Sequence, residues 1–522
     1  MAMREFEKMS NATTAAWPVV APVGDRTGAW SVFLSTRRLL VFVLLAAIFA
    51  MTAAQITDPD FWWHLRTGQF IYETRTIPHT DIFSFTAQGK EWVTHEWLAE
   101  VLMFGIYKFS GWGGLVVAFS LVMTAALWIA YRVCAKLAPH PYVAGASVLI
   151  GALATAPMWG VRPQMISFLF TSIYVAVLGE YVRGARAKSL WPLVPLMLVW
   201  VNMHGGYALG LGLIAVTGAG TVLDELMRER GERQLFARLR PLLLLFAACV
   251  LVVPLNPNGL RMFSYPFETL NSHAMHAYIE EWFTPNFHQF IAQPFAFLLF
   301  ATLVALALSP KRARHGELLL LCVATYAALR AWRNIPFFAL VAMPLLAEHA
   351  WHVLTGRAWW RWLTVPEKRE TGTKAFVQLA LNFVLLICVP VGLCVANVSK
   401  VMAKQATIER EKYPAAAVEF LRAHPGSGAI YNEYGWGGYL IWKLYPQREV
   451  FIDGRADVYG DAFMEETLAT MAGERDWRAP LDRYGVRTVL IKPNTALASL
   501  LRQDANWRSV YEDQQSVVFF KQ

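Results

Sequence analysis

Two short segments between the first two long apolar runs hold the residues best suited to chemistry. The first, residues 58–64 (DPDFWWH), places two carboxylates close to an imidazole. Pro59 favours a helix start, so Asp60 lies in the first turn and His64 follows one turn later on the same face. This spacing predicts a polar stripe just above a membrane. The alternative is that Asp58 and Asp60 only cap the helix and interact with its dipole.

The second segment, residues 92–100 (WVTHEWLAE), also combines acids with a histidine. Glu96 and Glu100 are one helical turn apart, and His95 precedes Glu96 at the start of an apolar surface helix. Carboxylates close to a bilayer are costly unless they are paired or used, so the pattern favours a functional site. A solvated helix face is the alternative.

Membrane helices must position these segments. Hydrophobic residues make up 56% of the 522 residues, charged residues 16%, and the mean hydropathy is +0.35. Soluble proteins carry about 25% charged residues, so the composition argues against a cytosolic enzyme as well as against disordered, collagen-like and coiled-coil chains. The net charge of +9 comes from short basic clusters between apolar runs, which indicates membrane topology and no nucleic-acid partner. The five cysteines show no metal or disulfide spacing.

Apolar runs near the length of a spanning helix recur along the chain as far as residue 402. We predict eleven spans, at 39–56, 113–131, 141–158, 164–182, 190–203, 206–224, 241–255, 295–309, 317–334, 336–354 and 375–398. With a cytoplasmic N-terminus, roughly 23 Lys and Arg residues fall inside and roughly 8 in the outer loops, as the positive-inside rule expects. This bias predicts an integral plasma-membrane protein of the bacterial inner membrane, with a periplasmic C-terminal part.

The chain therefore divides into a cytoplasmic tail (1–38), a transmembrane domain (39–400) and an extracytoplasmic domain (401–522). Two large outer loops, 57–114 and 256–294, belong to the transmembrane domain. The expected fold class is a polytopic α-helical membrane protein with a small C-terminal α/β domain.

Patterns outside the bilayer predict further elements. In the first outer loop, helices at 60–73 and 92–109 each have one aromatic and one polar face, so we expect them along the membrane surface. The C-terminal domain alternates strands with helices. Its strands are predicted at 429–432, 449–452, 488–491 and 516–520, and its helices at 413–423, 439–444, 461–471 and 481–484.

In this arrangement the chain resembles the GT-C class of membrane glycosyltransferases. That class has an acid near the start of the first outer loop, then a proline, then an aromatic-rich surface helix with a second acid. Here these are Asp58 or Asp60, Pro78, and the helix with Glu96. The usual Pro-Pro-Leu before that helix is replaced by Thr-His-Glu at 94–96, which leaves the substrate subfamily open. Two further segments, 200–206 (WVNMHGG) and 436–439 (WGGY), also resemble bacterial proteins of this class.

The resemblance implies transfer of a sugar from a polyprenyl phosphate or pyrophosphate carrier to an acceptor on the outer face. Such a transfer needs a base that takes the acceptor proton while the phosphate leaves an oxocarbenium-like anomeric carbon. We expect Asp60 to be that base, followed by Asp58, with Glu96 and His95 as further catalytic candidates.

The leaving phosphate must be held by cations, preferably by Arg, whose planar fork matches phosphate oxygens. The candidates at outer positions are His64, Arg66, Arg162, His204, Arg330 and Arg333. The positive-inside rule predicts few Lys and Arg residues at outer positions, so the arginines found there need an explanation. Snorkelling to lipid headgroups is the ordinary one.

Some members of the class use a divalent cation, Mg²⁺ or Mn²⁺, and others do not. The resemblance leaves open a metal bound at Asp58, Asp60, His64 or His95. An i, i+3, i+7 pattern in the second outer loop offers another set of metal ligands, namely His273, His276 and Glu280. No further motif supports that set.

Two loops of the C-terminal domain are also candidates for binding. Residues 453–457 (DGRAD) follow a predicted strand, where ligand-binding loops often occur, although a turn held by a salt bridge explains them equally well. Residues 432–436 (NEYGW) offer an aromatic platform to a sugar, or else pack in the core.

Two other functions stay open. A non-catalytic scaffold subunit would keep the GT-C shape and dock a membrane-protein partner through its outer domain, without need of Asp60 at a lipid phosphate. A transporter of lipid-linked substrates would need charges in mid-span, and the spans have almost none. The lack of a nucleotide-binding glycine loop argues against a nucleotide-sugar donor. The expected partners are membrane lipid, a polyprenyl-linked sugar, and an acceptor glycan, lipid or protein.

Overall fold

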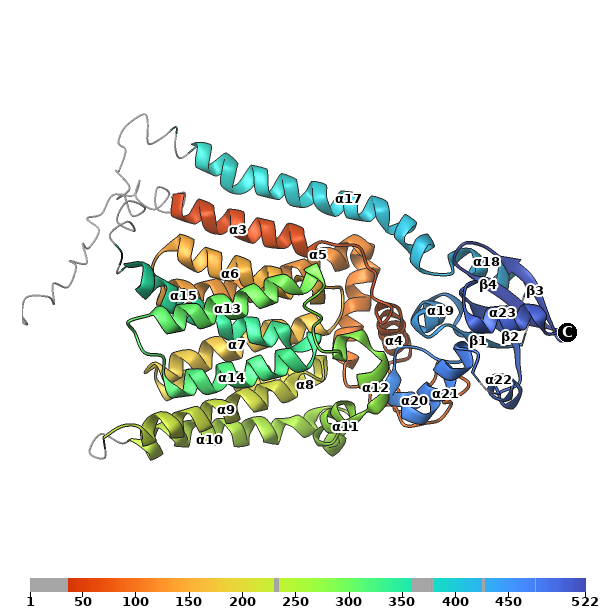
Figure 1. The fold of residues 1–522 in the computed structure, drawn as a ribbon, viewed down its shortest axis with the longest axis horizontal. Coiled ribbons are helices and arrows are strands. Elements are labelled where there is room, and N and C mark those ends of the chain that lie inside the picture. The colour runs from red at the N-terminus through yellow and green to blue at the C-terminus, as the bar shows by residue number, and fades with distance from the viewer. Residues whose placement is uncertain are drawn as a thin grey trace, which may run out of the picture.

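A bundle of long helices forms one end of the molecule, and the C-terminal domain lies at the other end (Figure 1). The computed structural model describes residues 36–229, 234–355, 357, 377, 380–424, 428–474 and 476–522. The predicted tail 1–38, apart from its last three residues, and most of the basic segment 357–374 lie outside the described residues.

Each range predicted as a span coincides with a helix over most of its described residues, while residues 375, 376, 378 and 379 of the last range lie outside the described residues. These helices are α3 (Thr36–Thr52), α5 (Trp97–Leu137), α6 (Pro141–Thr155), α7 (Gln164–Val182), α8 (Leu193–Met203), α9 (Tyr207–Leu226), α10 (Leu235–Val252), α13 (Gln293–Leu308), α14 (His315–Arg330), α15 (Ile335–Thr355) and α17 (Val389–Lys412). Within the described ranges, eight helical segments are long and apolar enough to cross a membrane. The helices α6 and α13 reach this length together with adjoining 3-10 turns, as Pro141–Met158 and Phe290–Leu308. The helices α3, α8 and α14 are shorter, with 17, 11 and 16 residues.

The helix α17 extends past the predicted end of the last span. It continues to Lys412 and carries the chain from the bundle to the C-terminal domain (Figure 1). The predicted boundary at residue 400 therefore falls inside a helix.

The first outer loop folds into two helices, as its amphipathic pattern predicts. The helix α4 (Phe61–Thr74) packs against the first part of α5, which bends away from the long span at Gly111. The backbone of Gly111 has φ 62° and ψ −160°, a conformation that glycine adopts without a Cβ penalty. Gly68 permits the close packing of α4, because a Cβ there would lie 2.0 Å from the Glu100 carbonyl oxygen.

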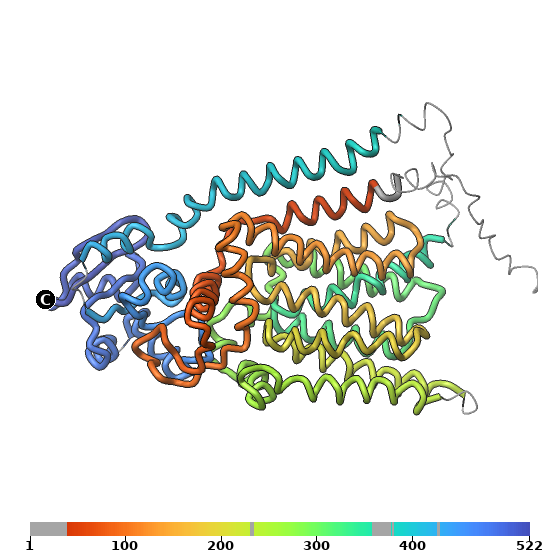
Figure 2. Tube along the Cα trace, turned by 180° about the vertical axis from the view of Figure 1, so that it is seen from behind, coloured from red at the N-terminus to blue at the C-terminus, as the bar shows by residue number. Residues whose placement is uncertain are grey.

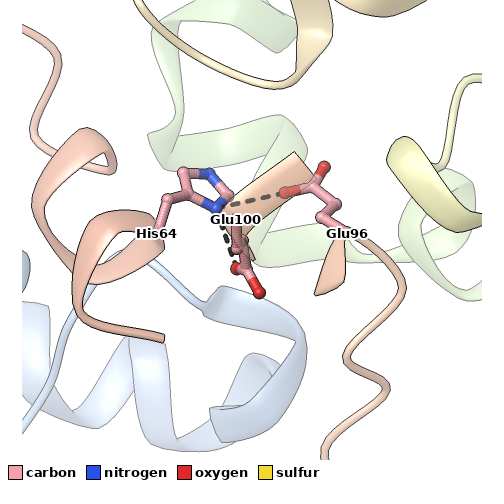
Figure 3. A group of neighbouring side chains, drawn as sticks. All are labelled: His64, Glu96 and Glu100. Atoms are coloured by element: carbon pink, nitrogen blue, oxygen red, sulfur yellow. Dashed lines mark hydrogen bonds and ion pairs between the residues drawn. The ribbon is translucent and has the colours of Figure 1, made fainter. Parts of the chain in front are cut away.

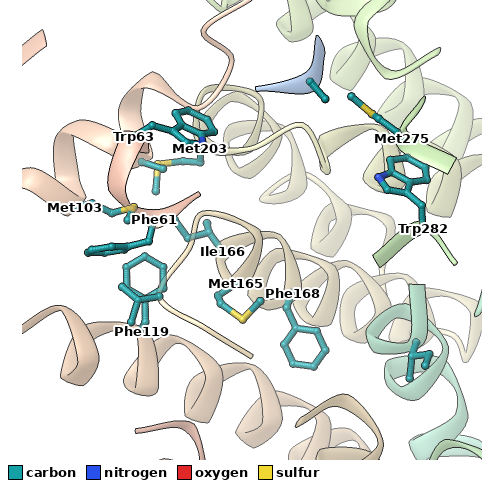
Figure 4. Close-up of a cluster of buried hydrophobic side chains, with 14 of the residues drawn as sticks. Phe61, Trp63, Met103, Phe119, Met165, Ile166, Phe168, Met203, Met275 and Trp282 are labelled. Carbon is teal, nitrogen blue, oxygen red and sulfur yellow. The ribbon is translucent and has the colours of Figure 1, made fainter. Parts of the chain in front are cut away.

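Aromatic side chains of α4 enter the core and do not face lipid. Phe61, Trp62 and Trp63 are all buried. Figure 4 shows Phe61 and Trp63 among Met103, Phe119 and the other buried side chains of a cluster that adjoins the first outer loop. This packing fixes the orientation of α4 relative to the bundle.

The C-terminal domain contains a four-stranded mixed sheet in the order β1-β2-β4-β3. The strands are β1 (Ala429–Asn432), β2 (Val486–Ile491), β3 (Trp507–Glu512) and β4 (Val517–Lys521). The strand β1 runs parallel to β2, and β4 runs antiparallel to both β2 and β3. The helices are α18 (Ala415–Ala423), α19 (Gly437–Leu444), α20 (Ala456–Tyr459), α21 (Asp461–Met471), α22 (Arg478–Arg483) and α23 (Ala496–Gln503).

Three predicted strands match this sheet, and one prediction was wrong. Residues 449–452 do not join the sheet, because their backbone turns to the first outer loop: the Val450 N–H donates to the Phe83 carbonyl at 3.0 Å, and the Phe85 N–H donates to the Val450 carbonyl at 3.3 Å. The strand β3 and the helix α23 were not predicted. The backbone of Val450 therefore connects the C-terminal domain to the first outer loop.

Figure 2 shows α4 and the rest of the first outer loop between the bundle and the C-terminal domain. The glycines of the 436–439 segment make this contact possible. A Cβ on Gly437 would lie 2.1 Å from the Ile452 carbonyl oxygen, and one on Gly438 would lie 2.6 Å from the Pro59 carbonyl oxygen. The start of α19 is thus pressed against the turn that presents Asp60.

Candidate active site

A cavity of about 690 Å³ lies where the two outer loops, several helix ends and the C-terminal domain meet. Its polar lining comes from residues far apart in the sequence, namely Asp58, Asp60, His64, His95, Glu96, Arg162, His204, Tyr265, Glu280, Glu281, Arg333, Tyr434 and Asp457. The cavity therefore combines groups that can accept protons with groups that can bind anions.

The two acids of the first outer loop have different contacts. Asp58 pairs with Arg162 (Oδ2 to Nη1, 3.1 Å), which also pairs with Glu281, and Asp58 accepts a hydrogen bond from the Asp60 N–H at 2.9 Å. Asp60 accepts one from the indole N–H of Trp63 at 3.2 Å, and its side chain does not cap α4. The alternative of a purely capping acid thus does not describe Asp60.

Burial sets the protonation of Asp60. Removal from bulk water raises the pKa of Asp60, and the negative charge of Asp58 raises it further, while His64 and the Trp63 N–H oppose the shift; the pKa reaches about 7. A carboxyl group with this pKa exchanges protons near neutral pH, which suits a general base.

The Glu96 carboxylate lies among three imidazoles. His64 Nδ1 is 3.3 Å from Glu96 Oε2, and His95 Nε2 and His204 Nε2 are 3.2 and 3.3 Å from Oε1. Burial alone would raise the pKa of Glu96, but the three histidines lower it well below its usual range. Glu96 is therefore a permanent negative charge in the site. Figure 3 shows its approach to His64, which also meets Glu100 at 3.1 Å.

Two of these histidines have opposite protonation states. His204 Nδ1 accepts hydrogen bonds from the Gly206 N–H at 2.8 Å and from the Ser167 hydroxyl at 2.8 Å, so its proton sits on Nε2 and points to Glu96. Burial lowers the pKa of His204 to about 3, which keeps it neutral. Burial also opposes charge on His95, but Glu96 outweighs it and raises the pKa of His95 to about 9.

Neighbouring residues set the direction of these hydrogen bonds. The Trp200 indole N–H donates to the Ser167 hydroxyl oxygen at 2.7 Å, which leaves the hydroxyl hydrogen for His204. His95 Nδ1 donates to the Val93 carbonyl at 3.0 Å, so both of its ring nitrogens face acceptors. Gly206 must be glycine, because a Cβ there would lie 2.3 Å from the Ser167 oxygen.

One set of residues within the described chain could hold a metal ion. His64, Glu96 and Glu100 each offer one ligand atom, and these three atoms lie within 4.8 Å of one another. Glu100 Oε2 is buried and has no hydrogen-bond partner among the described residues. Nitrogen and carboxylate donors suit Mn²⁺ or Zn²⁺. The Nδ1 of His64 meets two carboxylate oxygens as a hydrogen-bond donor, so a cation would have to replace its proton.

Arg333 brings a positive charge to the cavity. Its guanidinium carbon lies 4.3 Å from the centroid of the Trp282 ring, and no ion pair or hydrogen bond of this side chain is found among the described residues. Arg162, by contrast, is neutralised by Asp58 and Glu281. Arg333 is therefore available to an anion.

The C-terminal domain closes the cavity with its 453–457 loop. Arg455 is 2% exposed and forms a bidentate pair with Asp453 (2.8 and 2.6 Å) and an ion pair with Asp81 of the first outer loop (2.7 Å). Its guanidinium also lies over the rings of Phe83 and Trp92, at 5.1 and 4.4 Å. The salt-bridged turn expected as one alternative is therefore present, and the same loop lines the cavity.

Several predicted site residues lie elsewhere. Arg66 is two positions after His64 and so faces away from the cavity, where it donates to the Tyr445 carbonyl at 2.8 Å. Arg330 is exposed at the end of α14 and does not line the cavity. The chain leaves helical geometry at Ala331, before it reaches Arg333, which does line the cavity.

The metal set predicted in the second outer loop was wrong. The helix α12 (His273–Tyr278) ends before Glu280, so the i, i+7 relation is lost. His273 instead pairs with Glu465 at 3.0 Å, and His276 donates to the Leu270 carbonyl at 3.0 Å. Only Glu280 of this set lines the cavity.

Sequence reasoning missed Tyr265 and Glu281 and did not assign Tyr434 or Asp457 to this cavity. Tyr265 lies at the start of α11 (Tyr265–Asn271) and donates to Asp457 Oδ2 at 3.3 Å. Nothing in its local sequence distinguishes Tyr265 from the other aromatic residues of the second outer loop. For Asp457, the DGRAD loop after a strand was the available signal.

Known structures show which fold this is. No family model and no curated protein matches the chain. The oligosaccharyltransferase AglB of Archaeoglobus fulgidus, solved with an inhibitory peptide and a dolichol-phosphate, is similar with a TM-score of 0.56 and 11% identity, covering 89% of this chain and 70% of AglB. Apo ArnT of Cupriavidus metallidurans has a TM-score of 0.50 and 14% identity, covering 95% and 98%.

Both proteins are GT-C glycosyltransferases, and the similarity extends over nearly all of the chain described here. The expectation drawn from the first outer loop is therefore confirmed at the level of architecture. This chain has the GT-C fold, with its polar cavity enclosed by the two outer loops and the C-terminal domain.

Proposed function

We propose that this protein is a membrane glycosyltransferase that transfers a sugar from a polyprenyl phosphate carrier to an acceptor on the outer face of a bacterial inner membrane. The observation that carries the proposal is the cavity itself. It holds Asp60, a carboxyl group with a pKa of about 7, and Arg333, a cation that forms no ion pair within the part of the chain that the structure describes. The GT-C fold and the dolichol-phosphate in the AglB complex support the lipid carrier.

In the proposed step, an acceptor hydroxyl or amine attacks the anomeric carbon of the donor sugar. A bond from the acceptor atom to this carbon forms, and the bond from the carbon to the phosphate oxygen breaks. The acceptor proton moves to the Asp60 carboxylate, and the carrier phosphate leaves with the electron pair. A single displacement of this kind inverts the configuration at the anomeric carbon.

The leaving phosphate gains negative charge, which cations of the site stabilise. Arg333 is the first residue proposed for this role, and the protonated His95 adds a second positive charge beside Glu96. Arg162 is less suited, because Asp58 and Glu281 already occupy it. It serves to orient Asp58 next to the base.

A divalent cation is a further part of the proposal. His64, Glu96 and Glu100 are the residues that would hold it. When bound, it would supply positive charge for a phosphate oxygen. Chelation with EDTA should then lower the rate of transfer, and Mn²⁺ should restore it; an unchanged rate after chelation would remove the cation from the proposal.

The test uses the full-length protein in lipid nanodiscs with a panel of undecaprenyl-phosphate-linked sugars and a cell-envelope fraction as acceptor. Wild-type protein should release undecaprenyl phosphate and label the acceptor. Asp60→Asn should lower the rate about 10²- to 10⁴-fold, because general-base catalysis is lost, while the melting temperature stays near that of the wild type.

Glu73→Gln is the matched control, since Glu73 is an exposed acid on the same helix α4. It should transfer at the wild-type rate. Full activity of Asp60→Asn would contradict the role of Asp60, and a wild-type protein that turns over no donor would favour the scaffold alternative.

A further inference from the structure

We propose that Asp457 binds the acceptor, so that the C-terminal domain forms the acceptor half of the site, and that this acceptor is a polyhydroxylated group such as another sugar. The inference deepens the proposed function and rests on it. It concerns a residue that lies in a different domain from the proposed base.

The first observation is that Asp457 has free hydrogen-bonding capacity inside the molecule. It lines the cavity and is exposed there. Its one side-chain partner among the described residues is the Tyr265 hydroxyl, which donates to Oδ2 at 3.3 Å, and it forms no ion pair within the described ranges. A carboxylate has about four acceptor positions, so most of them remain open to a ligand.

The second observation places this loop beside the base. Gly454 lies so close to Asp60 that a Cβ on it would be 1.7 Å from Asp60 Oδ1. The acceptor atom must reach Asp60 within hydrogen-bond distance, about 2.6–3.2 Å, to give up its proton. An acceptor in that position meets the 453–457 loop, which carries Asp457.

The third observation concerns the division of charge in the cavity. Arg333 and Arg162 belong to helix ends and connections of the bundle, close to the apolar spans. Asp457 belongs to the C-terminal domain, which lies at the other end of the molecule from the helix bundle (Figure 1). A carrier phosphate anchored in the membrane is expected on the side of the bundle, which leaves the side of the C-terminal domain for the acceptor.

Tyr434 defines the chemical class of this acceptor. Tyr434 lines the same cavity, and among the described residues its hydroxyl makes one long hydrogen bond, 3.5 Å, to the Gly454 carbonyl. A phenol that donates and a carboxylate that accepts match neighbouring hydroxyl groups, each of which is both donor and acceptor. This combination favours a sugar over a purely apolar or anionic acceptor.

Arg455 is the positioning residue of this half-site. Its pair with Asp453 shapes the loop, and its pair with Asp81 fixes the loop on the first outer loop that carries Asp60. Arg455 also lines the cavity, but its guanidinium is already paired with Asp453 and Asp81, so we assign it no contact with the substrates. The buried guanidinium of Arg455 thus fixes the loop that carries Asp457 relative to the loop that carries Asp60.

The experiment compares wild type, Asp457→Asn and Asp457→Ala in nanodiscs, with the undecaprenyl-phosphate-linked sugar that the wild type uses and a cell-envelope glycan fraction as acceptor. Both variants should raise the KM for the acceptor at least tenfold and keep the dissociation constant for undecaprenyl phosphate within twofold. Periodate treatment of the fraction, which cleaves vicinal diols, should abolish transfer by the wild type. Glu474→Gln, an exposed acid of the same domain, is the control and should behave as wild type.

An unchanged acceptor KM in both variants would overturn the inference and leave the proposed function intact. An equal loss of undecaprenyl phosphate binding would also overturn it, because Asp457 would then shape the whole cavity. Undiminished transfer to the periodate-treated fraction would overturn the polyhydroxylated class. A wild-type protein that transfers no sugar would overturn the proposed function and, with it, the role of Asp457.

Discussion

Asp60 and Glu96 are carboxylates of one cavity with opposite surroundings. Asp60 faces another acid and few donors, whereas Glu96 faces three imidazoles. When the surroundings of two acids give them very different pKa values, one acid can exchange protons while the other stays charged. This contrast supports the proposal that Asp60 is the base, and the contacts of Glu96 with His95 and His204 suit it to orient these two rings.

The pKa of Asp60 predicts how transfer depends on pH. The base acts in its ionised form, which dominates above a pKa of about 7, so activity should be present at pH 8 and fall as the pH drops through 7. Below this point kcat/KM should decrease about tenfold per pH unit. Initial rates between pH 5.5 and 8.5 measure this limb, and a profile that is flat between pH 6 and 8 would contradict it.

Arg333 and Arg330 offer a matched pair of charge deletions. Arg333→Gln should weaken binding of undecaprenyl phosphate by about 10- to 100-fold, because charge-assisted hydrogen bonds contribute about 1.5–3 kcal/mol. Arg330→Gln should bind as wild type does, since Arg330 is exposed outside the cavity. Titration of the lipid monitored by native mass spectrometry measures both. Equal losses in the two variants would point to general membrane electrostatics.

At the scale of elements, the contact between the 453–457 loop and the first outer loop depends on buried charge. Arg455, Asp453 and Asp81 are all buried, and Arg455 lies over two aromatic rings. A buried pair is costly to break, because the remaining charge has no solvent to stabilise it. The same contact holds Gly454 against Asp60.

Arg455→Met should therefore destabilise the docked C-terminal domain by about 3–5 kcal/mol, since two carboxylates stay buried without their partner. Hydrogen exchange of residues 79–94 and 453–459 should speed up, and the rate of transfer should fall with it. Arg478→Met is the control, because the Arg478 side chain is 58% exposed in its pair with Asp504. That change should cost less than about 1 kcal/mol. Unchanged exchange in Arg455→Met would show that the loop is held in another way.

At the scale of the whole molecule, the two ends of the bundle differ in what they carry. The outer loops and the C-terminal domain lie at one end of the bundle (Figures 1 and 2). The opposite end carries ion pairs between helices, such as Arg183 with Glu317 at 2.7 Å and Arg238 with Glu225 at 3.3 Å. Basic residues on that side are expected to face the cytoplasm.

Cysteine labelling tests this direction. Ser499→Cys in the C-terminal domain should react with a membrane-impermeant maleimide on intact spheroplasts, and Lys188→Cys should react only after permeabilisation. The background replaces the exposed Cys322 and Cys388 with Ser. The opposite labelling pattern would invert the predicted topology.

The sequence by itself determined what depends on local pattern. Apolar run length located the helices, the amphipathic spacing of the first outer loop located α4 and the start of α5, and the acids of that loop marked Asp60 and Glu96. These features follow from helical periodicity and hydropathy, which act over one or two turns. Periodicity over one or two turns could not distinguish Arg333, which lines the cavity, from Arg330, which does not.

Only the tertiary structure decided which distant residues meet. The pairing of residue 450 with the first outer loop, in place of the sheet, depends on backbone partners more than 350 positions away. Likewise, Tyr265 and Asp457 reach the cavity because α11 and the 453–457 loop converge there. No local pattern records such contacts, since burial, charge neutralisation and the pKa of Asp60 arise from the whole set of neighbours that the fold assembles.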